Sequence, residues 1–276
     1  MIETDVALPD GRTLHAYDTG GAGLRTVVWH HGTPNIGSPP APLFAAADRL
    51  GLRWVSYDRP GYGGSTPRPG RDVASAAGDV AAVADALGVD RFAVLGHSGG
   101  GPHALACAAL LPDRVLAAAS VSGPAPFGAE GLDWFAGMAP GSAASLRAAA
   151  AGRAAKEHHQ ATAGEQDIGF VPADEAALAG EWSWFLTVVT PAMSRGPAPL
   201  VDDDLACVSP WGFDPTAIPG PVLLVHGADD RMVPAAHSRW LADHGKNTRL
   251  RVVPGEGHVS VLAAEGEAVL TWLASA

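Results

Sequence analysis

The chain has few cysteines and few basic side chains, and each shortage argues against a class of protein. Two cysteines, Cys107 and Cys207, are too few for a disulfide framework or a zinc cluster. Eighteen lysines and arginines stand against 29 aspartates and glutamates, and the formal charge of -11 repels nucleic-acid phosphates. The eleven histidines lack the spacing of a metal site. We therefore expect no metal, no cofactor and no nucleic-acid partner.

Long apolar runs are also lacking. No stretch of about 18 consecutive apolar residues occurs, as a membrane-spanning helix would need. The first ten residues lack the basic segment followed by an apolar stretch that is typical of a secretory signal. We expect a soluble, cytoplasmic protein without a membrane partner. Its 276 residues, of which 47% are hydrophobic, are enough for one large domain with an insertion.

Short segments rich in valine and leucine alternate with longer alanine-rich segments along much of the chain. This alternation predicts an α/β fold with a mostly parallel central sheet flanked by helices. Residues 4–8 and 13–17 are predicted to pair as a hairpin at the N-terminus. The further predicted strands are Thr26–His30, Arg53–Tyr57, Phe92–Leu95, Val115–Val121, Val222–Val225 and Leu250–Val253.

The alternation stops in residues 124–215, where no comparable strand pattern occurs. We expect this segment to be a helical cap, inserted into a catalytic domain formed by residues 1–123 and 216–276. Four of the eight tryptophans lie in it, and we expect substrate contacts from them, with core packing of all four as the alternative. They are Trp134, Trp182, Trp184 and Trp211. The acidic run Asp202–Asp204 is predicted to be a solvated loop.

A candidate nucleophile lies in the motif Gly96-His97-Ser98-Gly99-Gly100. The motif follows a predicted strand and precedes a helical segment at 102–111, so Ser98 is predicted to lie on a sharp strand-to-helix turn. Such a turn strains the serine backbone and exposes the hydroxyl. The strand and the helix then approach so closely that the flanking residues must be small, as Gly96 and Gly100 are.

A serine hydroxyl attacks a carbonyl only when a base takes its proton, and a carboxylate usually orients that base. Two carboxylates, Asp229 and Asp230, follow the predicted strand 222–225, and His258 follows the predicted strand 250–253. Loops at the carboxyl ends of parallel strands lie at one edge of a sheet. The order serine, aspartate, histidine also differs from the orders in chymotrypsin and subtilisin.

With these motifs the sequence resembles the α/β-hydrolase superfamily over essentially its whole length. The resemblance implies the α/β-hydrolase fold with an inserted helical cap. Residues 227–234 are similar to the family pattern G-x-x-D-x-x-V-P, and this similarity selects Asp230 over Asp229 as the triad acid. The G-x-G-H setting of His258 is similar to that of the family's catalytic histidine.

The segment His31-Gly32-Thr33-Pro34 resembles the family's H-G-x-P loop, which supplies part of an oxyanion hole. The resemblance implies that the backbone N–H groups of Thr33 and Gly99 are the two donors to the oxyanion. Residues 57–65 resemble a glycine-rich family signature, and we expect this loop to be scaffold.

The resemblance implies a serine hydrolase that forms an acyl-enzyme on Ser98, with His258 as base and Asp230 as its partner. The expected small-molecule substrate is a hydrophobic ester or lactone. Haloalkane dehalogenases and epoxide hydrolases are disfavoured, because they carry aspartate in place of this serine. The alternatives are a C–C bond hydrolase, a perhydrolase, an aminopeptidase or a non-hydrolytic ligand-binding member. The chain departs from the H-G-G-P-G pattern of the iminopeptidases, which argues against the peptidase.

Overall fold

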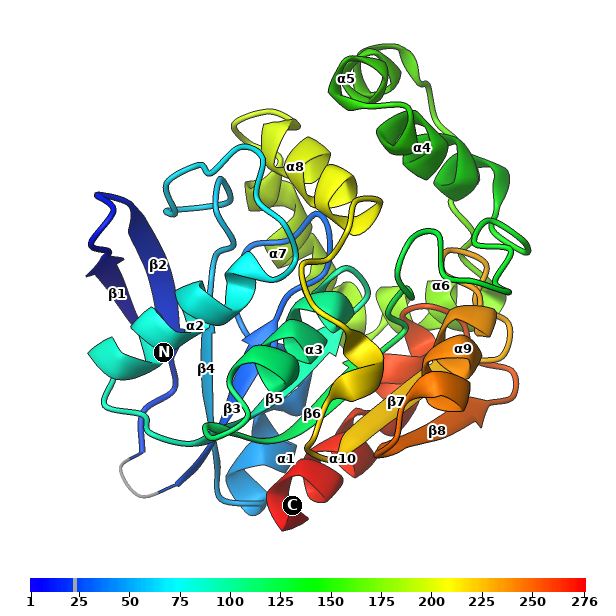
Figure 1. Cartoon of the computed structure of the whole chain (residues 1–276). Coiled ribbons are helices and arrows are strands. Elements are labelled where there is room, and N and C mark those ends of the chain that lie inside the picture. The colour runs from blue at the N-terminus through cyan, green and yellow to red at the C-terminus, as the bar shows by residue number, and fades with distance from the viewer. Residues whose placement is uncertain (22–23) are drawn as a thin grey trace.

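One eight-stranded sheet, in the order β1-β2-β4-β3-β5-β6-β7-β8, runs through the molecule (Figure 1). The computed structural model describes residues 1–21 and 24–276. In chain order the strands are β1 (Ile2–Ala7), β2 (Thr13–Asp18), β3 (Arg25–His30), β4 (Leu52–Tyr57), β5 (Phe92–His97), β6 (Val115–Val121), β7 (Val222–Gly227) and β8 (Thr248–Val253). The pairs β1–β2 and β2–β4 are antiparallel, and the remaining pairs are parallel. The predicted hairpin and the predicted mostly parallel sheet are confirmed.

Helices cover both faces of this sheet. Strand β3 shows why such strands are continuous apolar runs in the sequence. Neighbouring side chains of a strand point to opposite faces. Val28 packs into one apolar cluster, whereas Val27 and Trp29 pack into the cluster on the other face. Strands buried on both faces need apolar residues at every position. The first cluster contains residues of α2 (Ser75–Ala86), α3 (Gly100–Leu110) and α9 (Ala236–His244); the second contains residues of α1 (Phe44–Arg49) and α10 (Ser260–Ser275).

The segment between β6 and β7 is helical. Its helices are α4 (Pro140–Ala150), α5 (Arg153–Thr162), α6 (Pro172–Ala179), α7 (Phe185–Ala192) and α8 (Ala198–Cys207). Short 3-10 turns lie at Ala41–Leu43, Glu181–Trp184 and Pro215–Ala217. In Figure 1, α4, α5 and α8 lie above the sheet, separate from the helices that flank its faces. We refer to residues 124–215 as the inserted segment.

No helix within residues 1–21 and 24–276 combines the length and apolar character needed to cross a bilayer. Cys107 and Cys207 are free thiols, and Cys107 is buried.

Candidate active site

Four parallel strands, β3, β5, β7 and β8, are followed by the loops that carry Thr33, Ser98, Asp230 and His258. Because these strands run in one direction, their carboxyl ends lie at the same edge of the sheet, which is where open α/β sheets build their sites. The order of the strands in the sheet therefore brings together residues that are far apart in the sequence.

Ser98 lies on a tight turn between β5 and α3. Its φ of 54° is in the left-handed region, which non-glycine residues rarely adopt and which costs about 1–3 kcal/mol. Two backbone hydrogen bonds hold the turn: the Ser98 N–H donates to the Val121 carbonyl (2.8 Å), and the Ser98 carbonyl accepts from the Gly101 N–H (2.9 Å). A Cβ atom at Gly96 would overlap the Gly100 carbonyl. The strained turn and its need for small neighbours are as the sequence predicts.

Asp230 holds the ring of His258. The His258 Nδ1–H donates to Asp230 Oδ2 at 2.8 Å. The other carboxylate oxygen, Oδ1, accepts the backbone N–H groups of Met232 and Val233, each at 2.9 Å. Asp230 and His258 are buried, whereas Asp229 is exposed. With its proton on Nδ1, the His258 ring has a free lone pair on Nε2 that can accept a proton.

The charges of this pair stabilise each other. Burial by itself would raise the pKa of Asp230, but the adjacent His258 and the hydrogen bonds from His226 and His258 lower it well below its ordinary value. Burial would lower the pKa of His258, but the Asp230 carboxylate raises it above 6.5. The site therefore favours the ionised carboxylate and makes the imidazole a stronger base.

The Thr33 loop and the Gly99 backbone meet beside Ser98. A Cβ atom at Gly99 would overlap the Thr33 hydroxyl oxygen and lie 3.5 Å from Thr33 N, so the two backbones approach closely. Both residues line the same cavity as Ser98. Two backbone N–H groups in such a position are suited to binding an oxygen that becomes negative during acyl transfer.

A cavity of about 470 Å³ connects these groups. Thr33, Ser98, Gly99 and His258 all line it. The inserted segment supplies much of its apolar wall, through Leu146, Ile168, Phe170, Leu178, Phe185, Leu186, Val189 and Leu200. Among the described lining residues, Asp203 and Asp204 carry carboxylates, and none carries a guanidinium or an ammonium group. The cavity thus combines a serine and a histidine with a largely apolar chamber.

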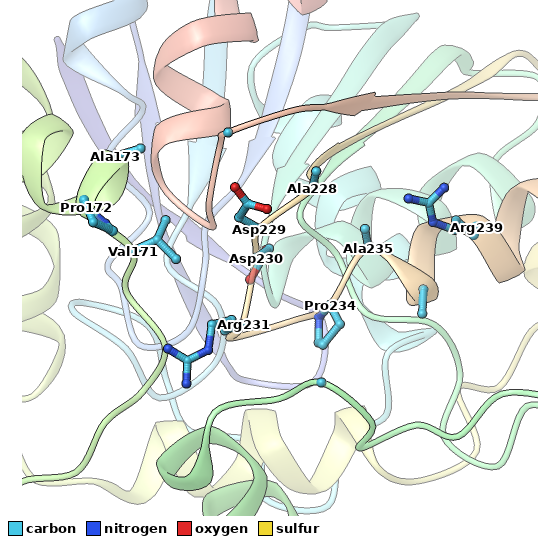
Figure 2. Close-up of a pocket in the computed structure, with 13 residues that line it drawn as sticks. Val171, Pro172, Ala173, Ala228, Asp229, Asp230, Arg231, Pro234, Ala235 and Arg239 are labelled. Atoms are coloured by element: carbon cyan, nitrogen blue, oxygen red, sulfur yellow. The ribbon is translucent and has the colours of Figure 1, made fainter.

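A second hollow, of about 780 Å³, is lined in part by residues 228–231 and 234–236 of and beside the Asp230 loop. Figure 2 shows Asp229 and Arg231 on this loop, with Arg239 further to the right on α9. Its described lining does not include Ser98 or His258. The smaller, apolar cavity is therefore the candidate active site.

The four tryptophans of the inserted segment divide into two groups. Trp134 lines the active-site cavity, and its indole N–H donates to the Ala125 carbonyl (2.8 Å). The other three lie outside the described lining of that cavity. Trp182 and Trp184 pack with Phe185 against the sheet, and Trp211 packs in a small separate cluster. Core packing, which was the alternative to substrate contact for all four tryptophans, therefore applies to Trp182, Trp184 and Trp211.

The histidines around the motifs are hydrogen-bonded structural side chains. His226 Nε2 donates to the Val233 carbonyl (2.6 Å), and His226 Nδ1 accepts from the Ser238 hydroxyl (2.7 Å). His97 Nε2 donates to the His258 carbonyl (3.0 Å), and burial lowers the pKa of His97 to about 3. Within the described residues, no group of three or more histidine, cysteine, aspartate or glutamate side chains could hold a metal ion.

The acidic run Asp202–Asp204 is not a solvated loop, and this expectation was wrong. The three residues belong to α8, and the Asp203 side chain is only 2% exposed. Asp203 pairs with Arg59, and Asp204 pairs with the buried Lys156. The sequence predicts a solvated run because the cationic side chains that neutralise these three acidic residues are distant in the sequence.

A second carboxylate of the inserted segment, Asp174 in α6, was also missed. It is fully buried beside the His258 loop, where it accepts backbone N–H groups of that loop. In the sequence, Asp174 is followed by Glu175 on a short helix, and it carries no motif that would separate it from a surface acid.

The chain belongs to the α/β-hydrolase family. The family model described as "alpha/beta hydrolase fold" matches residues 25–264. The chain is 30% identical to a non-heme chloroperoxidase of Streptomyces lividans, over 84% of this chain and 83% of that protein. It is also 30% identical to a 2-hydroxymuconate semialdehyde hydrolase of Pseudomonas putida, over 86% of this chain and 82% of that protein.

Solved structures show the same fold. An esterase from Exiguobacterium antarcticum superposes with a TM-score of 0.72 at 21% identity, covering 99% of this chain and 98% of that one. Together, the family match and the relatives support a hydrolase. The activities that their names give differ, so the reaction of this chain has to be argued from its own site.

Proposed function

We propose that the chain is a serine hydrolase that cleaves a small, uncharged and largely apolar ester or lactone through an acyl-enzyme on Ser98. One arrangement carries the proposal. His258 is held by Asp230 at 2.8 Å and lines the same cavity as Ser98, which lies on a strained turn. A hydroxyl and an oriented base at one cavity are the parts that nucleophilic acyl transfer requires.

In the proposed reaction, His258 Nε2 takes the hydroxyl proton of Ser98 as its oxygen attacks the substrate carbonyl. The carbonyl oxygen becomes negative in the tetrahedral intermediate, and the N–H groups of Thr33 and Gly99 bind it. The intermediate collapses, and the leaving alcohol takes the proton from His258. Water, deprotonated by the same imidazole, then attacks the acyl-enzyme and releases the acid. Asp230 stabilises the imidazolium in both halves.

The cavity wall supports the proposed substrate class. We propose that the inserted segment, residues 124–215, is a cap whose apolar side chains bind the acyl group. A substrate carboxylate in this chamber would be buried without a cationic partner, because no described lining residue is a lysine or an arginine. An uncharged ester or lactone carries no such penalty.

Labelling by a fluorophosphonate tests the nucleophile directly. The probe should attach to Ser98 of the native protein, and mass spectrometry of the digest should locate it there. The variant Ser98→Ala should stay unlabelled, while Ser209→Ala, which alters an exposed serine of the inserted segment, should be labelled like the native protein. Absence of labelling in the native protein would favour the non-hydrolytic ligand-binding alternative and reject the proposal.

The charge preference can be measured with two esters of equal acyl length, p-nitrophenyl butanoate and p-nitrophenyl hemisuccinate. We expect kcat/KM for the hemisuccinate to be at least about tenfold lower, since even 1.4 kcal/mol of unpaired burial produces that ratio. The variant Leu186→Arg places a guanidinium at the cavity wall and should narrow the difference. Equal kcat/KM values for the two esters would show that the chamber does not select against charge.

A further inference from the structure

Asp203 lies where the inserted segment meets the loops after β3 and β4. Arg59 Nη2 lies 2.6 Å and the Tyr62 hydroxyl 2.9 Å from Asp203 Oδ2, and both donate to it. Arg71 Nη2 lies 2.7 Å from Asp203 Oδ1. These side chains are all buried. A carboxylate with two guanidinium partners stays ionised: burial alone would raise the pKa of Asp203, but Arg59 and Arg71 lower it well below its usual range.

The same carboxylate binds the loop that carries the candidate oxyanion donor. The Thr33 hydroxyl donates to Asp203 Oδ2 at 2.7 Å and accepts from Arg59 Nη2 at 3.0 Å. Arg59 Nη2 also donates to the Gly32 carbonyl at 3.0 Å. The hydroxyl and the preceding peptide are thus tied to one ion pair. Rotating the Thr33 backbone would break these bonds in a site with little access to water.

We propose that Asp203 is a positioning residue, which aims the backbone N–H of Thr33 at the oxyanion by holding the Thr33 hydroxyl. The inference rests on the proposed function, because it takes Thr33 and Gly99 as the donors to that oxyanion. Donors that are fixed in advance stabilise the developing charge without reorganising during the reaction. Asp203 lines the cavity, but among the described residues its hydrogen bonds and ion pairs go to Thr33, Arg59, Tyr62 and Arg71, not to Ser98 or His258. It acts from the inserted segment, through the threonine side chain.

Thr33→Val tests this link without leaving a buried charge, since valine keeps the shape and removes the hydroxyl. Loss of a whole oxyanion donor lowers turnover by about 10²–10³, so misalignment of one donor should lower kcat roughly ten- to hundredfold. KM for p-nitrophenyl butanoate should change less than about threefold. Thr33→Ser keeps the hydroxyl and should restore most of the activity.

Two ligands of similar shape separate positioning from packing. Phenylboronic acid forms a tetrahedral adduct with a nucleophilic serine, and one boron oxygen occupies the oxyanion position. Benzamide keeps a planar carbonyl. In Thr33→Val the inhibition constant of the boronic acid should rise by about the factor by which kcat falls, while that of benzamide should stay within about twofold.

Asp203→Asn should produce the same selective loss, with Asp202→Asn as its matched control. Asp202 is the preceding residue of α8, pairs with Arg153 and lies outside the described lining of the cavity. In the double variant Asp203→Asn with Thr33→Val, the loss in kcat should be clearly smaller than the product of the two single losses, because the residues act through one bond. If Asp203→Asn does not fold, the variants Thr33→Val and Thr33→Ser, measured with the two ligands, still test the positioning role.

The outcomes separate this inference from the proposed function. If native Ser98 is not labelled by the fluorophosphonate, the proposed function fails, and the inference fails with it. If Ser98 is labelled but Thr33→Val keeps native kcat and boronic-acid affinity, the inference alone is wrong. It is also wrong if benzamide and boronic acid lose affinity equally, since that result indicates a change in cavity shape.

Discussion

Replacing Asp230 by asparagine should lower kcat for an activated ester by about 10⁴, the loss seen when the corresponding carboxylate of a serine protease becomes an amide. The surroundings of Asp230 decide which way the new amide faces. Oδ1 accepts two backbone N–H groups, from Met232 and Val233, so the amide oxygen must take this position. The NH₂ group is then forced into the place of Oδ2, opposite His258 Nδ1.

An amide NH₂ in that position donates to His258 Nδ1, where the carboxylate accepted. The ring then carries its proton on Nε2, which is the nitrogen that accepts the proton of Ser98 in the proposed reaction. The fold has no reason to change, because the asparagine matches the aspartate in size. The main defect should be the tautomer of the base, so kcat should fall much more than KM rises.

The dependence of rate on pH gives the variant a second signature. In the proposed reaction neutral His258 is the active form, so native kcat/KM should fall as the pH drops through the raised pKa of His258, which lies above 6.5. In Asp230→Asn the charge that raises this pKa is absent, and the residual activity should fall at a lower pH. Asp229→Asn, at the exposed neighbouring residue, should retain the native rate and profile. Near-native activity in Asp230→Asn would remove Asp230 from the triad.

Of the substitutions proposed, Asp174→Ala should cause the largest loss in the free energy of unfolding. Asp174 Oδ1 accepts the N–H groups of Val259 and Ser260, each at 2.8 Å. Its Oδ2 accepts those of Val171 (3.1 Å) and His258 (3.2 Å). Ser260 begins α10, so the carboxylate also binds donors that the start of a helix leaves unpaired. Alanine would leave these donors buried without partners.

Leaving several buried donors unpaired costs about 1–3 kcal/mol for each group before relaxation, so a total loss of about 3–5 kcal/mol is expected. Urea denaturation should show this as a lower midpoint. Turnover should fall as well, because the His258 loop loses an anchor. Glu175→Ala changes the next, exposed residue of α6 and should leave both quantities near native. A midpoint within the error of the native value would contradict the role given to Asp174.

The parts of the site that the sequence predicts are those encoded locally. Ser98 has its strand, its glycines and its helix within a few residues, and His258 follows its strand directly. Parallel strand order then brings their loops to one edge of the sheet. The sheet itself is predictable for the same reason, because burial on both faces leaves apolar runs such as those of β3 and β5.

The parts that were missed depend on partners far along the chain. Asp203 pairs with Arg59 across 144 residues, and Asp174 binds the backbone of the His258 loop across 84 to 86 residues. Charge patterning predicts that an acidic run is exposed to solvent unless its cationic partners lie nearby in the sequence. The tryptophans show the same limit, because composition alone could not distinguish Trp134, at the cavity, from Trp182, in the core.

Asp174 and Asp203 together bear on how such a protein could be rebuilt. A chimera that exchanges residues 124–215 for the corresponding segment of another hydrolase would leave Arg59 and Arg71 buried without their counter-charge, and the start of α10 without its acceptor. Transferring substrate preference between relatives therefore requires an acidic residue in the donor segment wherever the recipient keeps these buried arginines. It also requires a second acidic residue that faces the loop carrying the histidine. The inserted segment is not interchangeable on its own.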